Sequence, residues 1–520
     1  MNELMKLDSV SRKVKLKVSL LSIIIVGIII RLVYFPYELP LVIDAMDNFT
    51  YATAINYYGH LPTEWTPANN GWPMFLSFWF SIINLENSFQ YMQLQRLISV
   101  ILSSLIAVPV YFLCKRFFDE KLALVGAALF VFDPRIILNS LLGITEPLFI
   151  LLGITSLVVF LRHGRKETAL AFALAACCTV VRSEGIFLFF TLTVFFVLKY
   201  RISKDIVKTY LPSLLVFLLI LTPIMNYRME TIGSDGIFLR VSSEGTRILS
   251  DTSQGSTTGI VSGLELFTKY LGWVMIPGFL VFLPFGFIQY LRNRTKETNF
   301  IIIFLISSSI PILYAYTVQA QDTRYLYFLY PIFCLISLFA VKSYLAKVSK
   351  KNLAIVIIIA GILISSIGFY EYKKMDYEKE KELNEIARIV ADMTNGINFH
   401  PSETRYIRAA ELPNEWPFLF HDGTHKIKSI STKGYFSIEK YISDSKKNGL
   451  THLLVDDNMD LPEFLQYIYY NEERYGYLNK VFDSKDLGFK HRVKLFEIDL
   501  QKFESIDNQS IDLANIESRN

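Results

Sequence analysis

The basic segment Arg12-Lys13-Val14-Lys15 is followed at residues 18–35 by the apolar run VSLLSIIIVGIIIRLVYF, and residues 35–90 then contain no lysine or arginine. An apolar run of this length can cross a hydrocarbon layer of about 30 Å as a helix. Basic residues collect on the cytoplasmic side of membrane helices. The stretch therefore predicts a first membrane helix with a cytoplasmic N-terminus, followed by an external loop at about residues 35–90.

The rest of the chain repeats this pattern. Of its 520 residues 52% are hydrophobic, with 41 Phe and 29 Tyr, which is more than a soluble core of this size needs. Basic connections recur at every second turn and alternate with connections poor in basic residues. We predict a polytopic α-helical membrane protein with about eleven transmembrane helices. The apolar runs are residues 18–35, 91–113, 121–138, 145–161, 168–182, 185–200, 210–226, 264–291, 299–316, 324–345 and 353–371.

The run at 168–182 is short and is interrupted by Arg182-Ser183-Glu184-Gly185. It could form a tight external hairpin with its neighbour or a tilted, partly re-entrant element. The first apolar run lacks a small-residue cleavage site, so we interpret it as a retained helix. An odd number of spans places the C-terminus outside. We expect the protein to lie in the cell (plasma) membrane.

A change of composition at about Tyr372 marks a domain boundary. Residues 1–371 form the predicted membrane domain, and residues 372–503 read as a separate, soluble extracytoplasmic α/β domain. Its strand-like runs at 405–408, 453–455 and 493–498 alternate with helix-like runs at 382–393 and 462–470. We expect the polar tail, residues 504–520, to be disordered.

Several classes of chemistry have no signature in this chain. Cys114, Cys177, Cys178 and Cys334 lie in or beside apolar runs, and the seven histidines have no paired-ligand spacing. A glycine-rich phosphate loop is also missing, so any energy-rich substrate should arrive already activated. We expect no nucleic-acid partner and no certain cofactor.

The predicted external loop carries the first candidate catalytic residue, Asp47. Asp47 opens a helix-period run that ends at Gly59, so it could simply cap a helix. The same geometry could hold its carboxylate rigidly as a base for an incoming hydroxyl. Asp44, Tyr51 and Glu64 are candidate substrate-binding residues of this loop.

A second acid, Glu146, stands in Thr145-Glu146-Pro147 beside a span end. Charged groups at that depth are costly and are usually paired or functional. Glu146 could form a salt bridge with Arg135, could orient substrate hydroxyls as a second catalytic residue, or could hold a divalent cation together with Asp47. The sequence leaves these alternatives open.

Isolated arginines on the external side need a reason, because the charge rule predicts few basic residues there. A guanidinium can clamp a phosphate headgroup through two hydrogen bonds. Each arginine could instead snorkel or form a local ion pair, as Arg182 could with Glu184. The candidate substrate-binding residues are Arg182, Arg228, Arg240, Arg247 and Arg324, with Tyr325 beside the last.

The order of these short motifs resembles the GT-C glycosyltransferases, in particular the branch with protein O-mannosyltransferases and the lipid A aminoarabinose transferase. The resemblance covers roughly residues 20–345. Asn48, and not a second acid, follows Asp47, so the partner of Asp47 and any metal role stay open. The motifs are Asp47 with Tyr51 and Ala54, Gly71-Trp72-Pro73, Arg96, Pro109-Val110-Tyr111, Lys115-Arg116-Phe117-Phe118, Thr145-Glu146-Pro147, Arg182-Ser183-Glu184-Gly185, Asn226-Tyr227-Arg228 and Arg324-Tyr325.

The resemblance implies a sugar donor linked to dolichyl or another polyprenyl phosphate. The external arginines would hold its phosphate, and Asp47 would act as the base. An acceptor hydroxyl of a protein, lipid or glycan would displace the polyprenyl phosphate with inversion, on the extracytoplasmic face. Such a reaction would serve protein glycosylation or cell-envelope synthesis.

Two other functions compete with this interpretation. A transporter of lipid-linked sugars, or a non-enzymatic scaffold of a surface-glycan complex, would not need Asp47. An oligosaccharyltransferase or glycan polymerase would share the scaffold, but the chain lacks the sequence WWDYG that marks the oligosaccharyltransferase acceptor-reading domain.

Overall fold

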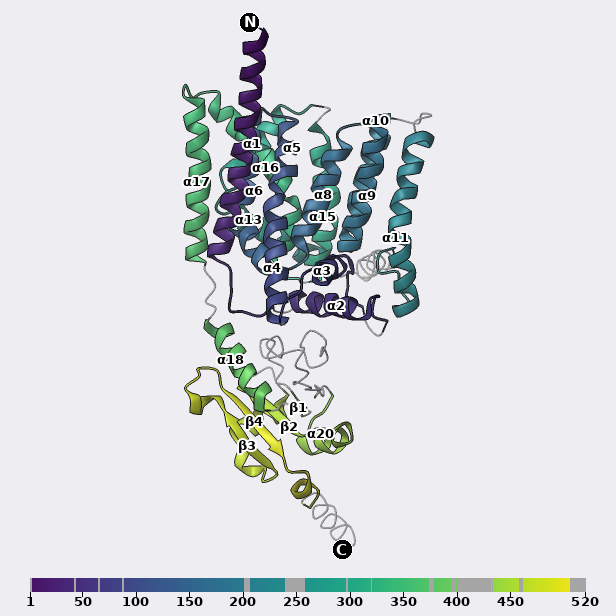
Figure 1. Ribbon diagram of the computed structural model, residues 1–520, viewed down its shortest axis with the longest axis vertical. Helices are drawn as coiled ribbons and strands as arrows, with labels where there is room; N and C mark the ends of the chain where they lie inside the picture. The colour runs from purple at the N-terminus through teal and green to yellow at the C-terminus, as the bar shows by residue number, and fades with distance from the viewer. Residues whose placement is uncertain are drawn as a thin grey trace. The chain divides into compact units, whose positions relative to one another are not determined.

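The protein is represented by a computed structural model that describes residues 2–41, 44–63, 66–86, 88–200, 206–238, 258–295, 298–318, 320–373, 378–393, 399–400, 432, 434–457 and 462–505 (Figure 1). The chain divides into two compact units. The first comprises Met1–Phe35, Tyr58–Ser81 and Leu94–Lys374. The second comprises Pro36–Tyr57, Ile82–Gln93 and Met375–Asn520.

The first unit is a bundle of apolar helices. Each of the eleven apolar runs contains at least one helix. In the described residues up to 372, the α-helices, of which α2 falls in the second unit, are α1 (Asn2–Val33), α2 (Asp44–Tyr58), α3 (Gly71–Ile82), α4 (Ser88–Leu105), α5 (Ala107–Lys115), α6 (Glu120–Val131), α7 (Pro134–Leu141), α8 (Glu146–Phe160), α9 (Arg165–Val181), α10 (Ile186–Tyr200), α11 (Leu211–Ile232), α13 (Thr258–Met275), α14 (Phe282–Arg292), α15 (Phe300–Thr317), α16 (Tyr330–Leu345) and α17 (Lys351–Tyr372). The shorter 3-10 elements η1 (Ser183–Gly185) and η4 (Thr323–Leu329) connect some of them.

Not every run is long and straight enough to count as a span by itself. Among the described residues, five helical stretches have the length and apolar composition to cross a membrane, or six if the bent pair α6 and α7 is one span. The pair bends by 51° where Pro134 begins α7, because proline has no amide hydrogen to donate. The run at 264–291 forms two helices, α13 and α14. The total of eleven spans stays a prediction.

Residues 168–181 lie within one continuous helix, α9, which packs against α10 across the short turn at Arg182–Gly185, so the two form the tight hairpin considered for this run. Its external position and a tilted, partly re-entrant course stay predictions. The chain leaves the helix only at Arg182, which has the extended backbone angles φ −149° and ψ 129°. The four-residue interruption therefore falls between α9 and α10 and turns the chain without breaking either helix.

Burial separates central helices from peripheral ones. Of the most apolar 18-residue segment in Thr323–Leu345, 72% is buried inside the protein. The corresponding share in α17 is only 22%. The residues from Leu122 to Val131 of α6 are all buried. A helix that is apolar all round belongs in a bundle interior. Figure 1 shows α8 beside α9, which also packs against α11, while α16 packs against α6 and α14.

Close backbone contact sets the start of α3 against the end of α9. A Cβ atom on Gly71 would lie 2.6–2.7 Å from backbone atoms of Val180 and Val181. The next residue, Trp72, donates its indole N–H to the Gly143 carbonyl at 3.2 Å, and the Gln95 amide donates to the same oxygen at 2.7 Å. Only a glycine permits this approach, which anchors α3 on the bundle.

The C-terminal part of the second unit is built around a mixed sheet. Its strands are β1 (Phe399–His400), β2 (His452–Asp456), β3 (Leu478–Asp483) and β4 (Val493–Ile498), in the spatial order β1-β2-β4-β3. β1 runs parallel to β2, whereas β4 is antiparallel to both β2 and β3. Its α-helices in the described residues are α18 (Glu378–Met393), α20 (Ile438–Ser445) and α21 (Glu463–Tyr470).

Alternating side chains of this sheet bury two cores. Leu453, Val455 and Phe496 pack with α20 and α21, while Leu454 and Leu495 pack with α18. This is the period-two alternation of a strand that is covered on both faces. The predicted strands at 453–455 and 493–498 and the helices at 382–393 and 462–470 are confirmed. The predicted strand at 405–408 and residues 506–520 of the tail lie outside the described residues, and the boundaries 372 and 503 stay predictions.

We expect Gly71→Ala to lower the melting temperature of the purified protein by several degrees. The added methyl group would overlap the α9 backbone, and overpacking of this kind costs about 1–3 kcal/mol. Gly361→Ala in α17 is the matched control, because a Cβ there meets nothing within 4 Å. An equal loss in both variants would contradict the close-approach argument.

Candidate functional site

The turn between α9 and α10 presents a charged pair. Arg182 follows the last residue of α9, and Glu184 lies in η1. Their side chains form an ion pair of 2.9 Å, the local pairing considered as an alternative role for Arg182. A Cβ on Gly185 would lie 2.6–2.8 Å from the backbone of Cys178 and Thr179, so a glycine lets the chain fold back tightly. The turn therefore holds both side chains at the helix ends.

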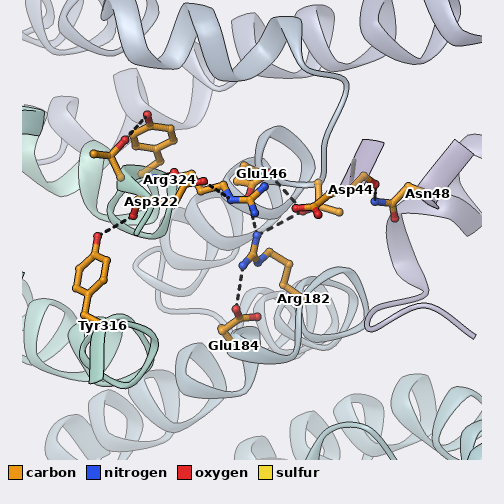
Figure 2. A network of polar contacts seen from close by, with 11 residues as sticks. Asp44, Asn48, Glu146, Arg182, Glu184, Tyr316, Asp322 and Arg324 are labelled. Atoms are coloured by element: carbon orange, nitrogen blue, oxygen red, sulfur yellow. Dashed lines mark hydrogen bonds and ion pairs between the residues drawn. The ribbon is translucent and has the colours of Figure 1, made fainter. Parts of the chain in front are cut away.

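Glu146, the first residue of α8, joins this pair. Its Oε1 atom accepts a hydrogen bond from Nη1 of Arg182 at 2.6 Å (Figure 2). A carboxylate at a helix N-terminus also interacts favourably with the helix dipole. The alternative of a salt bridge to Arg135 is wrong. The Arg135 guanidinium donates to the Ile276 carbonyl and lies 4.9 Å from the centre of the Phe369 ring.

A third chain segment brings Arg324 to the same carboxylate. Arg324 lies in η4, whose N-cap Asp322 accepts from the Arg324 amide at 2.8 Å. Its Nε atom lies 2.9 Å from Oδ2 of Asp322 and 4.0 Å from Oε1 of Glu146. The Tyr316 hydroxyl donates to the Asp322 carbonyl at 3.0 Å and so fixes the turn. Two guanidinium groups thus meet one carboxylate oxygen.

These charged groups form the polar end of a cavity with apolar walls. The cavity holds about 530 Å³ of unoccupied space, its open mouth included. Tyr325 also lines it, and its ring centre lies 5.9 Å from the Arg182 guanidinium. The side chains of Glu146, Arg182 and Arg324 are 5%, 15% and 26% exposed. The apolar walls are Phe149, Ile150, Phe187, Leu188, Pro311, Ile312 and Phe328.

The structure gives Arg228 a different place. Its Nη1 atom donates to Asn70 Oδ1 at 2.7 Å and to the Pro67 carbonyl at 2.9 Å. Arg228 is buried and does not line the cavity of Glu146. Its contacts tie the end of α11 to the segment before α3, so a structural reason accounts for this arginine.

Sequence reasoning missed Asn69 and Asn70. The side-chain oxygen of Asn69 accepts a hydrogen bond from the backbone amide of Ser183 at 2.9 Å. The side-chain oxygen of Asn70 accepts one from the Arg228 guanidinium. The two amides therefore connect α3 with the α9–α10 turn and with α11. The signal in the sequence is the pair of adjacent asparagines directly before Gly71-Trp72-Pro73.

Of the candidate carboxylates of the first loop, Asp44 and Asp47 lie in α2, in the part of the chain that belongs to the second unit. The helix begins at Asp44, so Asp47 lies within its first turn and is not the N-cap. Asp47 is exposed, Asp44 is half-buried, and Tyr51 is fully buried. The Asn48 amide donates to the Asp44 carbonyl at 2.5 Å (Figure 2). Glu64, Arg240 and Arg247 lie outside the described residues.

No group of three or more His, Cys, Asp or Glu side chains within the described ranges could hold a metal ion. Of the two suggested ligands, Glu146 already has guanidinium nitrogens 2.6 and 4.0 Å from its Oε1 atom. Neighbouring cations oppose the approach of another cation. Glu146 as arranged here does not fit a metal ligand.

Comparison with known proteins gives a family match and a fold. Residues 73–227 match the dolichyl-phosphate-mannose-protein mannosyltransferase family. This segment contains Glu146 and Arg182. No protein with a curated description matches the chain in sequence.

Solved structures share the fold across most of the chain. ArnT from Cupriavidus metallidurans, bound to undecaprenyl phosphate, superposes with a TM-score of 0.58 at 10% identity, covering 92% of this chain and 97% of ArnT. The oligosaccharyltransferase AglB from Archaeoglobus fulgidus, in complex with an inhibitory peptide and a dolichol-phosphate, gives a TM-score of 0.52 at 12% identity, with 89% and 72% covered. Both are GT-C glycosyltransferases. The predicted resemblance is confirmed.

We expect Glu146→Ala and Arg182→Ala to be strongly non-additive in stability. Each single change removes the shortest ion pair of a mostly buried charge and leaves it only Glu184 or the more distant Arg324, whereas the double change removes both charges. A double-mutant cycle by denaturant titration in detergent should give a coupling of about 1–3 kcal/mol.

The control pair for this cycle is Lys115 and Glu120, whose charged atoms lie 2.7 Å apart, close to the 2.6 Å of Glu146 and Arg182, but whose side chains are 40% and 28% exposed. We expect its coupling to stay below about 1 kcal/mol. Additive losses at Glu146 and Arg182 would show that their ion pair does not stabilise the bundle.

Proposed function

We propose that this protein transfers a sugar from a polyprenyl- or dolichyl-phosphate-linked donor to the hydroxyl of a protein, lipid or glycan acceptor. The observation that carries the proposal is the cavity in which Arg182 and Arg324 meet at the end of apolar walls. A lipid-linked sugar phosphate has the same division into a charged head and an apolar chain. The match of residues 73–227 to a family named for dolichyl-phosphate-mannose supports this donor class.

The two arginines would bind the donor phosphate. Guanidinium groups form strong, charge-assisted hydrogen bonds with phosphate oxygens, and these bonds gain strength away from water. Aromatic and aliphatic walls such as Phe149, Phe187 and Phe328 would take the first part of the lipid chain. Among the compared structures, ArnT binds undecaprenyl phosphate and AglB a dolichol-phosphate, which supports a lipid phosphate here.

Phosphate binding would require Glu146 to release Arg182. The network contains two guanidinium groups and three carboxylates, those of Glu146, Glu184 and Asp322. A phosphate added to this network would be repelled at close range by the carboxylates. Glu184 and Asp322 are each held locally, within two residues of their arginines. Glu146 comes from another helix, so we infer that the phosphate displaces it.

The released Glu146 carboxylate could then accept hydrogen bonds from sugar hydroxyls, a role in orienting the donor. Tyr325 lines the cavity and could contact the sugar through its ring or hydroxyl. Asp44 in the first turn of α2 is a further candidate for a substrate contact.

Asp47 would act as the base. Its exposed carboxylate would accept the proton of the acceptor hydroxyl as the acceptor oxygen attacks the anomeric carbon. The bond from that carbon to the phosphate oxygen breaks, and the polyprenyl phosphate leaves with the electron pair. The arginines would stabilise the charge on this leaving group. Attack opposite the leaving group inverts the anomeric configuration.

The reaction would take place on the extracytoplasmic face of the membrane. By the charge rule, the loop at about residues 35–90 and the span ends with Glu146 and Arg324 would lie on the side away from the basic turns, with the N-terminus cytoplasmic. The α/β domain, residues 372–503, would also lie outside, where it could bind the acceptor or the growing glycan. A divalent cation stays a separate hypothesis, and no step above depends on one.

Replacing Asp47 with Asn should abolish transfer while the protein keeps its fold. The amide cannot accept the acceptor proton at neutral pH, and base catalysis typically contributes about 10²–10⁴-fold. The measurement is the release of polyprenyl phosphate from a radiolabelled monosaccharide donor by purified protein, with and without a chelator.

The control for this assay is Glu265→Gln, which makes the same change of charge on an exposed residue of α13. Full turnover by Asp47→Asn would rule out Asp47 as the base. A folded wild-type protein that releases nothing from a panel of donors would favour the transporter or scaffold alternative.

Replacing Glu146 with Gln should make polyprenyl phosphate a stronger inhibitor, with a roughly tenfold lower inhibition constant. The isosteric amide no longer competes for Arg182 by charge, and a tenfold change corresponds to about 1.4 kcal/mol.

Arg324→Ala should act in the opposite direction and raise the KM for the donor more than that for the acceptor. An unchanged inhibition constant in Glu146→Gln would exclude the displacement step, and an unchanged donor KM in Arg324→Ala would exclude its phosphate contact.

A further inference from the structure

A second recess lies at the opposite end of α8 from Glu146. It opens where α5 and α8 end side by side, and these two helices pack against each other. Because α8 has 15 residues, the recess is about 20 Å from the candidate site along the helix axis. It holds about 510 Å³ of unoccupied space, its open mouth included. The recess therefore has no part in the chemistry proposed above.

Three cations line the recess: Lys115, Arg116 and Arg162. None of the lining residues is acidic. The Lys115 ammonium forms a 2.7 Å ion pair with Glu120, which is partly exposed and therefore weak. Arg116 is oriented by a 2.7 Å contact with Nε2 of His163. In the part of the chain that the structure describes, no carboxylate forms an ion pair with Arg116 or Arg162, so the recess retains a positive field.

The remaining walls are apolar. Leu113 and Leu161 are almost fully buried, and Val158 lies beside them. Phe112 is 42% exposed and lies in the run 91–113, a predicted membrane span. A free phosphate ion would use only the cations of such a site, whereas a phospholipid would also use the apolar wall.

We propose that this recess binds the phosphate headgroup of an anionic phospholipid. The charge rule for membrane proteins explains why basic residues occur at this end of the bundle. It does not explain why cations from two separate turns line one recess whose other walls are apolar. That combination matches the junction between the headgroup and the acyl chains of a lipid, and basic pockets between membrane helices are known to recognise such headgroups. The proposal is independent of the sugar-transfer reaction.

The test is lipid binding to the purified full-length protein by native mass spectrometry, with phosphatidylglycerol compared with phosphatidylcholine. We expect tighter binding of phosphatidylglycerol. The double variant Arg116→Gln with Arg162→Gln should weaken the binding of phosphatidylglycerol about tenfold and leave the binding of phosphatidylcholine unchanged. The reason is that each cation near an anionic headgroup adds to the binding free energy. Arg162→Gln alone should show a smaller loss in the same direction, and it tests the proposal even if the double variant unfolds.

The matched control is Lys350→Gln with Lys351→Gln, which removes two exposed cations from another basic turn. We expect it to bind phosphatidylglycerol like the wild type. An equal loss in this control would mean that overall charge, and not the recess, attracts the lipid. Displacement of phosphatidylglycerol by an equal concentration of inorganic phosphate, or unchanged binding in both arginine variants, would also overturn the proposal.

Discussion

The ion pair between Arg182 and Glu146 joins two helix ends that are 36 residues apart in the chain. Its side chains are 15% and 5% exposed, so removing either charge would leave the other mostly buried with fewer partners. Arg324 approaches the same Glu146 oxygen from a third segment. This shared carboxylate holds together the start of α8, the end of α9 and the start of η4, and side chains at these three positions line the cavity.

The polar cluster depends in turn on close packing around α9. Gly71 and Gly185 both allow backbones to approach within distances that a side chain would block. Asn69 and Asn70 then satisfy polar groups of the α9–α10 turn and of α11. Polar backbone and charged side chains are tolerated within a membrane bundle only where protein or a water-filled cavity satisfies them. The glycines and asparagines before α3 therefore support the site without lining it.

The charge balance of the cavity has a functional consequence. An uncompensated pair of arginines would bind any anion, but three carboxylates moderate Arg182 and Arg324. A ligand must then offer more than charge, for example an apolar chain that fits the cavity walls and hydroxyls for a displaced Glu146. Selectivity for a lipid-linked sugar over a free phosphate would follow from this competition.

The apolar runs, the basic turns and the residues at span ends could be recognised in the sequence because hydropathy and charge are local properties. For this reason each apolar run up to Tyr372 contains a helix, and Glu146, Arg182 and Arg324 stand at helix ends. Pairing could not be recognised in this way. Only the tertiary structure decided that Glu146 meets Arg182 and not Arg135, and that Arg228 anchors Asn70 away from the cavity. The physical reason is that the partner of a charge depends on which helix ends pack together, and that packing is set by contacts such as Gly71 on α9, between residues far apart in the chain.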